Sequence, residues 1–326
     1  MAEGHAGRIG AGRREDAVAP PIPAARAVPP SQGISQVFED ERVLGLVLLL
    51  PTVVLLGLFI AYPFVKGVSI SLTSATVGDA GAFIGLDNFR RLLNDTIFQR
   101  AAWNTVVYTV IATIGKLALG LWLALLLNRQ FRGQRLVRAS MLLPFIIPTV
   151  LSTFAWKWMF DPTFSVLNWS LYNLGFITTR IGWLTDPVLA LGSVIVVNIW
   201  RGMPFYAITL LAGLQTVNPE LHEAAALDGA NGWQRFWRIT WPLLLPVTMV
   251  VTLFSVIQTF ADFQLVYVLT GGGPANSTHL FATYAYQIGI ITARLGEGAA
   301  ASLMMFPALF IIVVIQLWYI RRVEGA

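Results

Sequence analysis

The sequence of 326 residues has no cysteine, only three histidines, and charged residues at 12% of its length. The absence of cysteine excludes disulfide bonds, thiolate metal sites and cysteine nucleophiles. His5, His222 and His279 lie far apart, without the spacing of metal ligands. No His-Glu-x-x-His motif occurs in the apolar segments, which argues against an intramembrane enzyme. The sequence therefore predicts no catalytic residue and no metal site.

Hydrophobic residues make up 56% of the chain, and the mean hydropathy is +0.67. Soluble domains carry about 25% charged residues, so this composition indicates a multi-pass membrane protein. Six apolar segments are long enough to span a bilayer, which takes about 20 residues. They are residues 43–62, 103–127, 141–160, 188–211, 242–263 and 301–320. We therefore predict an all-α membrane protein with six transmembrane helices and no nucleic-acid partner, because the basic residues are dispersed.

The ends and loops give an orientation. Residues 1–40, rich in Ala, Pro, Gly and Arg, predict a disordered tail, and residues 41–326 predict one transmembrane domain. The loop "NRQFRGQRLVRAS" has four arginines and no acid, so the positive-inside rule places it, and both termini, in the cytoplasm. The 63–102 segment is also basic and weakens this prediction. Its stretch "LDNFRRLLNDTIFQRAAWN" predicts an amphipathic helix at the outer surface.

The stretch "EAAALDGANGWQRFWRITWPLLLP" (223–246) is polar and aromatic but lies between two apolar segments. Asn218 and Pro219 predict a helix start, and the alanines after Glu223 favour a helix with little side-chain bulk. Gly229 predicts its end, since glycine tolerates the left-handed conformation. We therefore expect a short cytoplasmic helix ending in a glycine joint.

A second short helix is predicted to start at Asn231, with Gln234 as its capping-box partner. Trp233, Phe236 and Trp237 would share one face, which we expect to anchor the helix to the bundle. Pro242 predicts a turn into the fifth span. From the residues alone, the pair of helices is either a contact surface for another protein or an amphipathic linker at the membrane surface.

The same stretch closely resembles the EAA signature of the membrane permeases of bacterial ABC importers. "WRGMPFYAITLLAGLQTVNPELHEAA" (200–225), "LTGGGP" (269–274) and "GLDNFRRLL" (85–93) are similar to segments of carbohydrate permeases, in particular the maltose-system F-type subunit. The resemblance covers about residues 43–322, and the 63–102 segment is too short for the large periplasmic domain of some relatives. The signature positions are Glu223, Ala224, Ala225, Asp228, Gly229, Ala230, Phe236, Ile239, Pro242 and Pro246.

The resemblance implies a permease subunit of the bacterial inner membrane, which is not itself an enzyme. Its implied partners are a second, G-type permease, two ATP-binding cassette subunits and an extracytoplasmic solute-binding protein that delivers a sugar. Short cytoplasmic coupling helices in the loop 218–242 would contact the ATPases. The chain has no GxxxxGK[ST] motif, so ATP and Mg²⁺ would bind to the partners and no cofactor to this chain. The coupling residues implied are Glu220, Glu223, Ala224, Ala225, Asp228, Gly229, Ala230 and Phe236.

A sugar pathway needs aromatic faces and polar groups within the spans. The candidates are Asn198, Arg201, Phe254, Gln258 and Asp262, although each of them also suits packing between helices. Arg201 is expected either to shape the pore or pair with an acid such as Asp262, or else to extend toward the interface. Lys116 and Lys157 are further charges in or near spans. An oligosaccharide or disaccharide is expected, with a sugar phosphate or polyol as alternatives.

The main alternative is an ion-coupled secondary transporter. Such a protein would have inverted repeats and a coupling carboxylate deep in the membrane. The sequence has neither a convincing internal repeat nor a clear acid of that kind.

Overall fold

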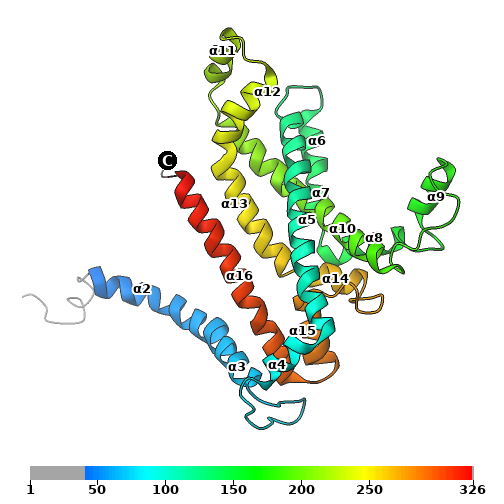
Figure 1. The fold of residues 1–326 in the computed structure, drawn as a ribbon. Coiled ribbons are helices and arrows are strands. Elements are labelled where there is room, and N and C mark those ends of the chain that lie inside the picture. The colour runs from blue at the N-terminus through cyan, green and yellow to red at the C-terminus, as the bar shows by residue number, and fades with distance from the viewer. Residues whose placement is uncertain (1–40, 325–326) are drawn as a thin grey trace, which may run out of the picture. The chain divides into compact units, whose positions relative to one another are not determined.

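The computed structural model describes residues 41–324 of the chain, which are almost entirely helical (Figure 1). Within that range the extended backbone pairs only at the isolated bridges Thr73–Phe83 and Thr76–Asp79. The predicted tail, residues 1–40, lies outside the described residues. The chain divides into two compact units, Met1–Ile60 and Ala61–Ala326. The first unit contributes α2 (Glu41–Leu56), and the second contains the helices that form the site.

Further helices follow α2 along the chain. They are α3 (Tyr62–Ser71), α4 (Asp87–Asn94), α5 (Thr96–Leu127), α6 (Gln134–Met141), α7 (Leu143–Ile146), α8 (Thr149–Met159), α9 (Val166–Asn173), α10 (Pro187–Gln215), α11 (Pro219–Leu227), α12 (Gly232–Arg235), α13 (Trp241–Phe260), α14 (Gln264–Leu269), α15 (Phe281–Tyr286) and α16 (Leu295–Glu324). Three π-helical turns join neighbouring helices: Gly57–Ala61, Phe236–Thr240 and Gln287–Ile291.

Five helical stretches are long and apolar enough to cross a membrane, which agrees with five of the six predicted spans. They are Leu44–Ser71, Thr96–Leu127, Pro187–Gln215, Gly232–Phe260 and Leu295–Tyr319. Each helix extends beyond its predicted span at one end or both, because charged and small residues there still fit a helix, whereas the helix predicted over 242–263 already ends at Phe260.

The predicted span 141–160 is not one straight helix. Gln134–Ile146 and Thr149–Met159 meet at an angle of 93°. Ile147 and Pro148 between them have extended backbone, with ψ of 131° and 133°. Proline lacks the N–H that a helix interior needs and disfavours helical geometry in the residue before it, so the helix breaks here. The break brings the start of α8 to the wall of a cavity described below.

The predicted amphipathic helix over 86–104 is also interrupted. Asp95 has extended backbone, and its carboxylate accepts a hydrogen bond from the Ile97 amide at 2.8 Å, so it caps α5. The amphipathic part is confined to α4, where Asn88 and Leu92 are buried. Asn88 donates to the backbone carbonyls of Ser71 and Thr73, each at 2.8 Å, and fixes α4 against the end of α3.

The core between α5 and α10 depends on small residues in α5. A Cβ added to Gly120 would lie 2.4 Å from Tyr206 Cβ and 3.2 Å from the Ala207 amide nitrogen. This close approach is typical of helix pairs in membranes, where small residues let two backbones come together. A core cluster continues the interface toward the end of the bundle that carries α11, with members Ala124, Leu127, Tyr206, Leu210, Leu211, Leu214, Leu244 and Val251.

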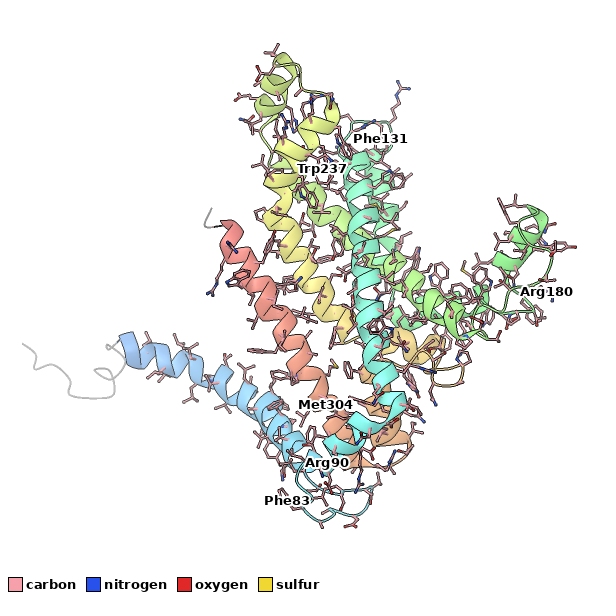
Figure 2. The ribbon with its side chains drawn as sticks, in the orientation of Figure 1. Phe83, Arg90, Phe131, Arg180, Trp237 and Met304 are labelled. Carbon is pink, nitrogen blue, oxygen red and sulfur yellow. The ribbon has the colours of Figure 1, made fainter. Side chains whose placement is uncertain are left out.

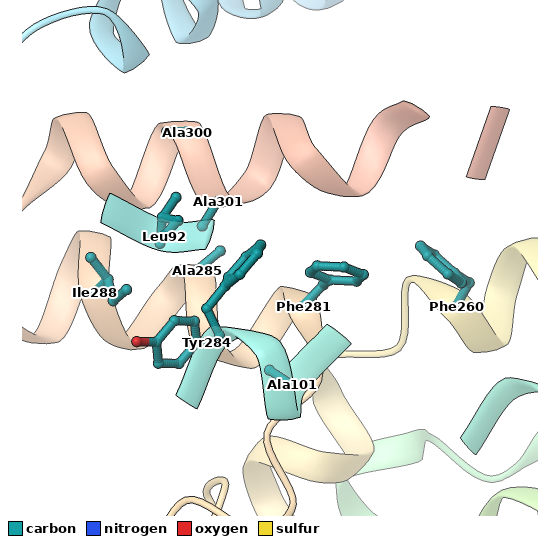
Figure 3. Close-up of a cluster of buried hydrophobic side chains, with 10 residues drawn as sticks. Leu92, Ala101, Phe260, Phe281, Tyr284, Ala285, Ile288, Ala300 and Ala301 are labelled. Carbon is teal, nitrogen blue, oxygen red and sulfur yellow. The ribbon is translucent and has the colours of Figure 1, made fainter. Parts of the chain in front are cut away.

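A second cluster closes the opposite end of the bundle, where α4, α5, α15 and α16 meet. Figure 3 shows Leu92, Phe281 and Tyr284 grouped beside Ala300 and Ala301 of α16. The Tyr284 hydroxyl donates to the carboxylate of Asp95, the residue that caps α5. The cluster therefore ties the start of the second span to the start of the last one.

The loop before α15 folds around His279, a ring that is only 3% exposed. A Cβ on Gly272, whose φ is +90°, would lie 2.1 Å from His279 Cε1, so only glycine fits there. Asn104 of α5 donates to the carbonyls of Ser277 at 2.7 Å and His279 at 3.2 Å. Ser277 and His279 thus join this loop to α5, and Gly272 of the "LTGGGP" motif packs against the His279 ring.

Burial lowers the pKa of His279 below its usual range, so the folded chain holds the neutral ring. Above about pH 6.5, protonation of His279 should not change the free energy of unfolding. As the pH falls below that value, the free energy of unfolding should fall, because the unfolded chain binds a proton that the buried ring does not. Melting temperatures measured from about pH 5 to 8 would show this decline. In a His279→Gln variant the melting temperature should decline less at low pH. An identical dependence of the melting temperature on pH in that variant and in the original chain would contradict the prediction.

Candidate functional site

A cavity of about 350 Å³ lies between the spanning helices, and it contains four of the five predicted pathway residues. Asn198 and Arg201 come from α10, and Phe254 and Gln258 come from α13. The broken third span adds a residue on each side of its bend, Phe145 and Thr149. The remaining lining residues are Lys116, Gly202, Phe205, Tyr206, Ser255 and Thr259.

Asp262, the fifth predicted residue, does not line this cavity. It is buried beside the cavity, where its Oδ2 accepts from the Tyr108 hydroxyl at 2.7 Å and from Asn198 Nδ2 at 3.1 Å. Its Oδ1 lies 3.4 Å from the Leu265 amide nitrogen. Three donors, one each from α5, α10 and the first turn of α14, therefore hold this carboxylate in place.

Of the alternatives for Arg201, the pairing with Asp262 is not formed. Arg201 donates instead to the hydroxyl of Thr149, the first residue of α8. Among the side chains that the structure describes, the only ion pairs with N···O within 4.0 Å are Arg90–Asp87 and Arg294–Glu297. The side-chain donors to Asp262 are instead the amide of Asn198 and the phenol of Tyr108.

Lys116 is a cavity residue that the predicted pathway set did not contain. It is only 4% exposed, and its Nζ donates to the Thr259 hydroxyl at 2.6 Å. Gly202 makes room for it, because a Cβ there would lie 2.4 Å from Lys116 Cδ. The signal in the sequence was the lysine itself, since an ionisable residue inside a span is costly and faces protein or water.

Aromatic side chains line part of the cavity. Phe145 and Phe205 stack with their ring centroids 5.6 Å apart, and Phe254 is 58% exposed in the isolated chain. Two other aromatic residues of these helices pack elsewhere: Phe260 is buried in the cluster of Figure 3, and Trp200 stands edge-on to Trp156 at 5.4 Å. The cavity therefore combines apolar ring faces with amide, hydroxyl and cationic groups.

The short helices between α10 and α13 match their predicted local structure. The Asn218 side chain accepts from the Glu220 amide at 3.0 Å, and Pro219 is the first residue of α11. Gly229 has a φ of +81° and follows the end of α11. Asn231 and Gln234 form both hydrogen bonds of a capping box, each 2.9 Å long. The predicted short helix ending at Gly229, and the capped helix start at Asn231, are confirmed.

These helices lie at one end of the bundle, together with the arginine-rich loop. Figure 2 shows Trp237 and Phe131 at this end, and Phe83 and Arg90 at the other. A groove of about 970 Å³ lies between the arginine-rich loop and these helices, and Arg129, Glu223 and Arg235 are among its lining residues. On α11, Ala224 is exposed and Leu227 is 90% exposed. Helix α11 thus exposes small and apolar side chains at the outside of the bundle.

Two details of the second helix differ from the predictions. Trp233 is 72% exposed and stands edge-on to Trp237 at 5.5 Å, so Phe236 and Thr240, rather than the tryptophans, turn toward the bundle. The chain also does not turn at Pro242. Gly232–Phe260 is one continuous helix, because the π-helical turn Phe236–Thr240 precedes the proline and the proline sits in the first turn of α13.

Long apolar helices around a polar cavity, with a short helical hairpin exposed at one end, define the transmembrane subunit of a transporter. Residues 116–325 match the family described as binding-protein-dependent transport system inner membrane component. The chain belongs to this family, so the resemblance found in the sequence is confirmed.

Curated relatives and solved structures agree. The chain is 38% identical to the sulfoquinovosyl glycerol transport system permease protein SmoG of Agrobacterium fabrum, over 86% of this chain and 91% of the relative. It is 34% identical to the trehalose/maltose transport system permease protein MalF of Thermococcus litoralis, over 86% and 96%. A bacterial ABC transporter that imports the acidic polysaccharide alginate contains a similar chain, with a TM-score of 0.77, 25% identity, and coverage of 88% and 98%.

These findings make the chain a multi-pass permease of the ABC importer type, with the all-α fold that was predicted. They set aside the ion-coupled secondary transporter. Another structure of the alginate importer contains an alginate pentasaccharide-bound periplasmic protein, and this chain is similar to its permease with a TM-score of 0.76.

Proposed function

We propose that this chain forms half of the membrane pathway for a saccharide, an oligosaccharide or disaccharide, that an extracytoplasmic binding protein delivers. The observation that carries the proposal is the cavity between α5, α10 and α13. Asn198 and Gln258 supply amides for sugar hydroxyls, and Phe254 supplies an apolar ring face. Relatives named for trehalose, maltose and sulfoquinovosyl glycerol transport support this substrate class.

The second element of the proposal is a docking surface on α11 for an ATP-binding subunit. Small side chains at Ala224 and Ala225 permit close approach, and Glu223 is exposed for pairing with a basic group of the partner. ATP and Mg²⁺ would bind to two such subunits and not to this chain, and a second, G-type permease would complete the pathway. The residues assigned to coupling are Glu220, Glu223, Ala224, Ala225, Asp228, Gly229, Ala230 and Phe236.

The orientation follows from charge. Arg129 of the arginine-rich loop lines the same groove as Glu223 of α11, so the loop and the coupling helices belong to one side of the membrane. The positive-inside rule makes that side the cytoplasm. Both termini then lie in the cytoplasm.

Purification in mild detergent followed by reconstitution tests the function. The chain co-expressed with the other importer subunits should co-purify with an ATPase subunit. In proteoliposomes the complex should take up a labelled saccharide only when ATP and the binding protein are both present. Recovery of the chain without any ATPase subunit, or uptake driven by an ion gradient in the absence of ATP, would overturn the proposal.

A further inference from the structure

We infer that the cavity selects acidic saccharides, which carry a carboxylate, sulfonate or phosphate group. This inference deepens the proposed function and rests on it. It is based on the charged residues of the lining, which include the basic side chains of Lys116 and Arg201 but no aspartate or glutamate. A neutral sugar needs no cation in such a cavity, and two cations within membrane-spanning helices carry a high desolvation cost.

The partners of the two cations are neutral. Lys116 Nζ donates to the hydroxyl of Thr259, and Arg201 donates to the hydroxyl of Thr149. In the described part of the chain, no carboxylate oxygen lies within 4.0 Å of either cation. A hydroxyl satisfies only one N–H of each group, so each group keeps further N–H donors for an anionic ligand.

The nearest acid leaves the cavity positive. Asp262 is turned toward Tyr108 and Asn198, whose hydrogen bonds occupy its Oδ2, and it does not line the cavity. One carboxylate behind the wall also does not balance two cations. An anionic group bound between Lys116 and Arg201 would supply the missing counter-charge through charge-assisted hydrogen bonds.

Two further groups on the wall suit an anionic sugar. Thr149 begins α8, an 11-residue helix whose N-terminal amides lack partners within the helix and carry the positive end of its dipole. Asn198 is 4% exposed, and its Oδ1 has no hydrogen-bond partner, so it can accept from a sugar hydroxyl. The cationic side chains and α8 thus favour the charged group, and the amide favours the hydroxyls.

The absence of cysteine in the chain allows a direct test in the assembled importer. A Phe254→Cys variant places one thiol of this chain on the cavity wall, and the partner subunits are used in cysteine-free form. The thiol is modified with anionic 2-sulfonatoethyl and cationic 2-(trimethylammonium)ethyl methanethiosulfonate, and each rate is divided by that of a free thiol in solution. We expect the anionic reagent to be favoured at least about tenfold, because two nearby positive charges act on reagents of opposite sign.

The preference should fall several-fold when Lys116→Gln or Arg201→Gln is added. It should persist with Lys116→Arg, which keeps the charge, and with Lys157→Gln, because Lys157 donates to the Val268 carbonyl and does not line the cavity. A disaccharide carrying a uronate, such as cellobiouronic acid, should protect the thiol at concentrations at which neutral cellobiose does not. Equal normalised rates, no modification by either reagent, or equal protection by the two sugars would overturn the inference.

The proposed function fails by a different result, which is the lack of ATP-dependent uptake of any saccharide, neutral or acidic. A transporter that takes up neutral saccharides and shows no anionic preference at Phe254→Cys would keep the function and refute the selectivity.

Discussion

Replacing Gly229 with tryptophan should abolish ATP-driven uptake, by at least about 100-fold, while the chain still folds and inserts. Gly229 has a φ of +81°, and nothing lies within 4 Å of a Cβ built on it. The first atom of an added side chain therefore meets no atom of this chain. The loss would come from an ATPase subunit that must approach α11 closely, and from the cost of placing a non-glycine residue in the left-handed region, about 1–2 kcal/mol. Uptake and ATP hydrolysis by the reconstituted complex measure it.

Gly229→Asn separates the two causes, because asparagine tolerates the left-handed conformation and is small. We expect this variant to keep uptake within several-fold of the original. If the tryptophan variant transports normally, α11 is not a docking surface at this position. If both variants are equally inactive, backbone conformation rather than contact with a partner is responsible.

Gly120→Leu should give a large loss of stability, about 3 kcal/mol or more, since it forces apart α5 and α10 where they pack closely. An added Cβ would lie 2.4 Å from Tyr206 Cβ and 3.2 Å from the Met203 carbonyl oxygen, and a backbone cannot yield as a side chain can. The melting temperature of the detergent-solubilised complex and the yield of inserted protein measure the effect.

Gly192→Leu is the matched control. Gly192 also lies in a spanning helix, α10, and its added Cβ would meet nothing within 4 Å. We expect its melting temperature to be unchanged or slightly higher, because leucine is the better helix former. Equal losses from both substitutions would show that the close packing of α5 against α10 is not what Gly120 maintains.

Features governed by neighbouring residues were predictable from the sequence. Hydrophobic length gave five of the spans, and Asn218, Gly229, Asn231 and Gln234 predicted caps that the structure contains. Each of these depends on residues within one or two turns. Asn198, Arg201, Phe254 and Gln258 were also predicted together, because polar and aromatic residues in apolar spans are few.

What depends on distant residues was not predictable. Lys116 meets Thr259 across 143 positions, and Thr149 meets Arg201 across 52, so no local pattern contains either contact. The prolines were ambiguous for a related reason. Pro148 breaks its helix and Pro242 does not, and the difference is a π-helical turn before Pro242 that the local sequence does not reveal.

The continuous helix Gly232–Phe260 has a consequence for how motion could travel through the subunit. Bending is easiest near Pro242 and Pro246, where backbone hydrogen bonds are missing, close to the groove beside α11. Beyond Pro246 the helix has no such weak point and carries Phe254, Ser255, Gln258 and Thr259. A displacement of the exposed hairpin would therefore move these four residues together as one rigid segment of the cavity wall. Lys116 would move with them, because it is hydrogen-bonded to Thr259.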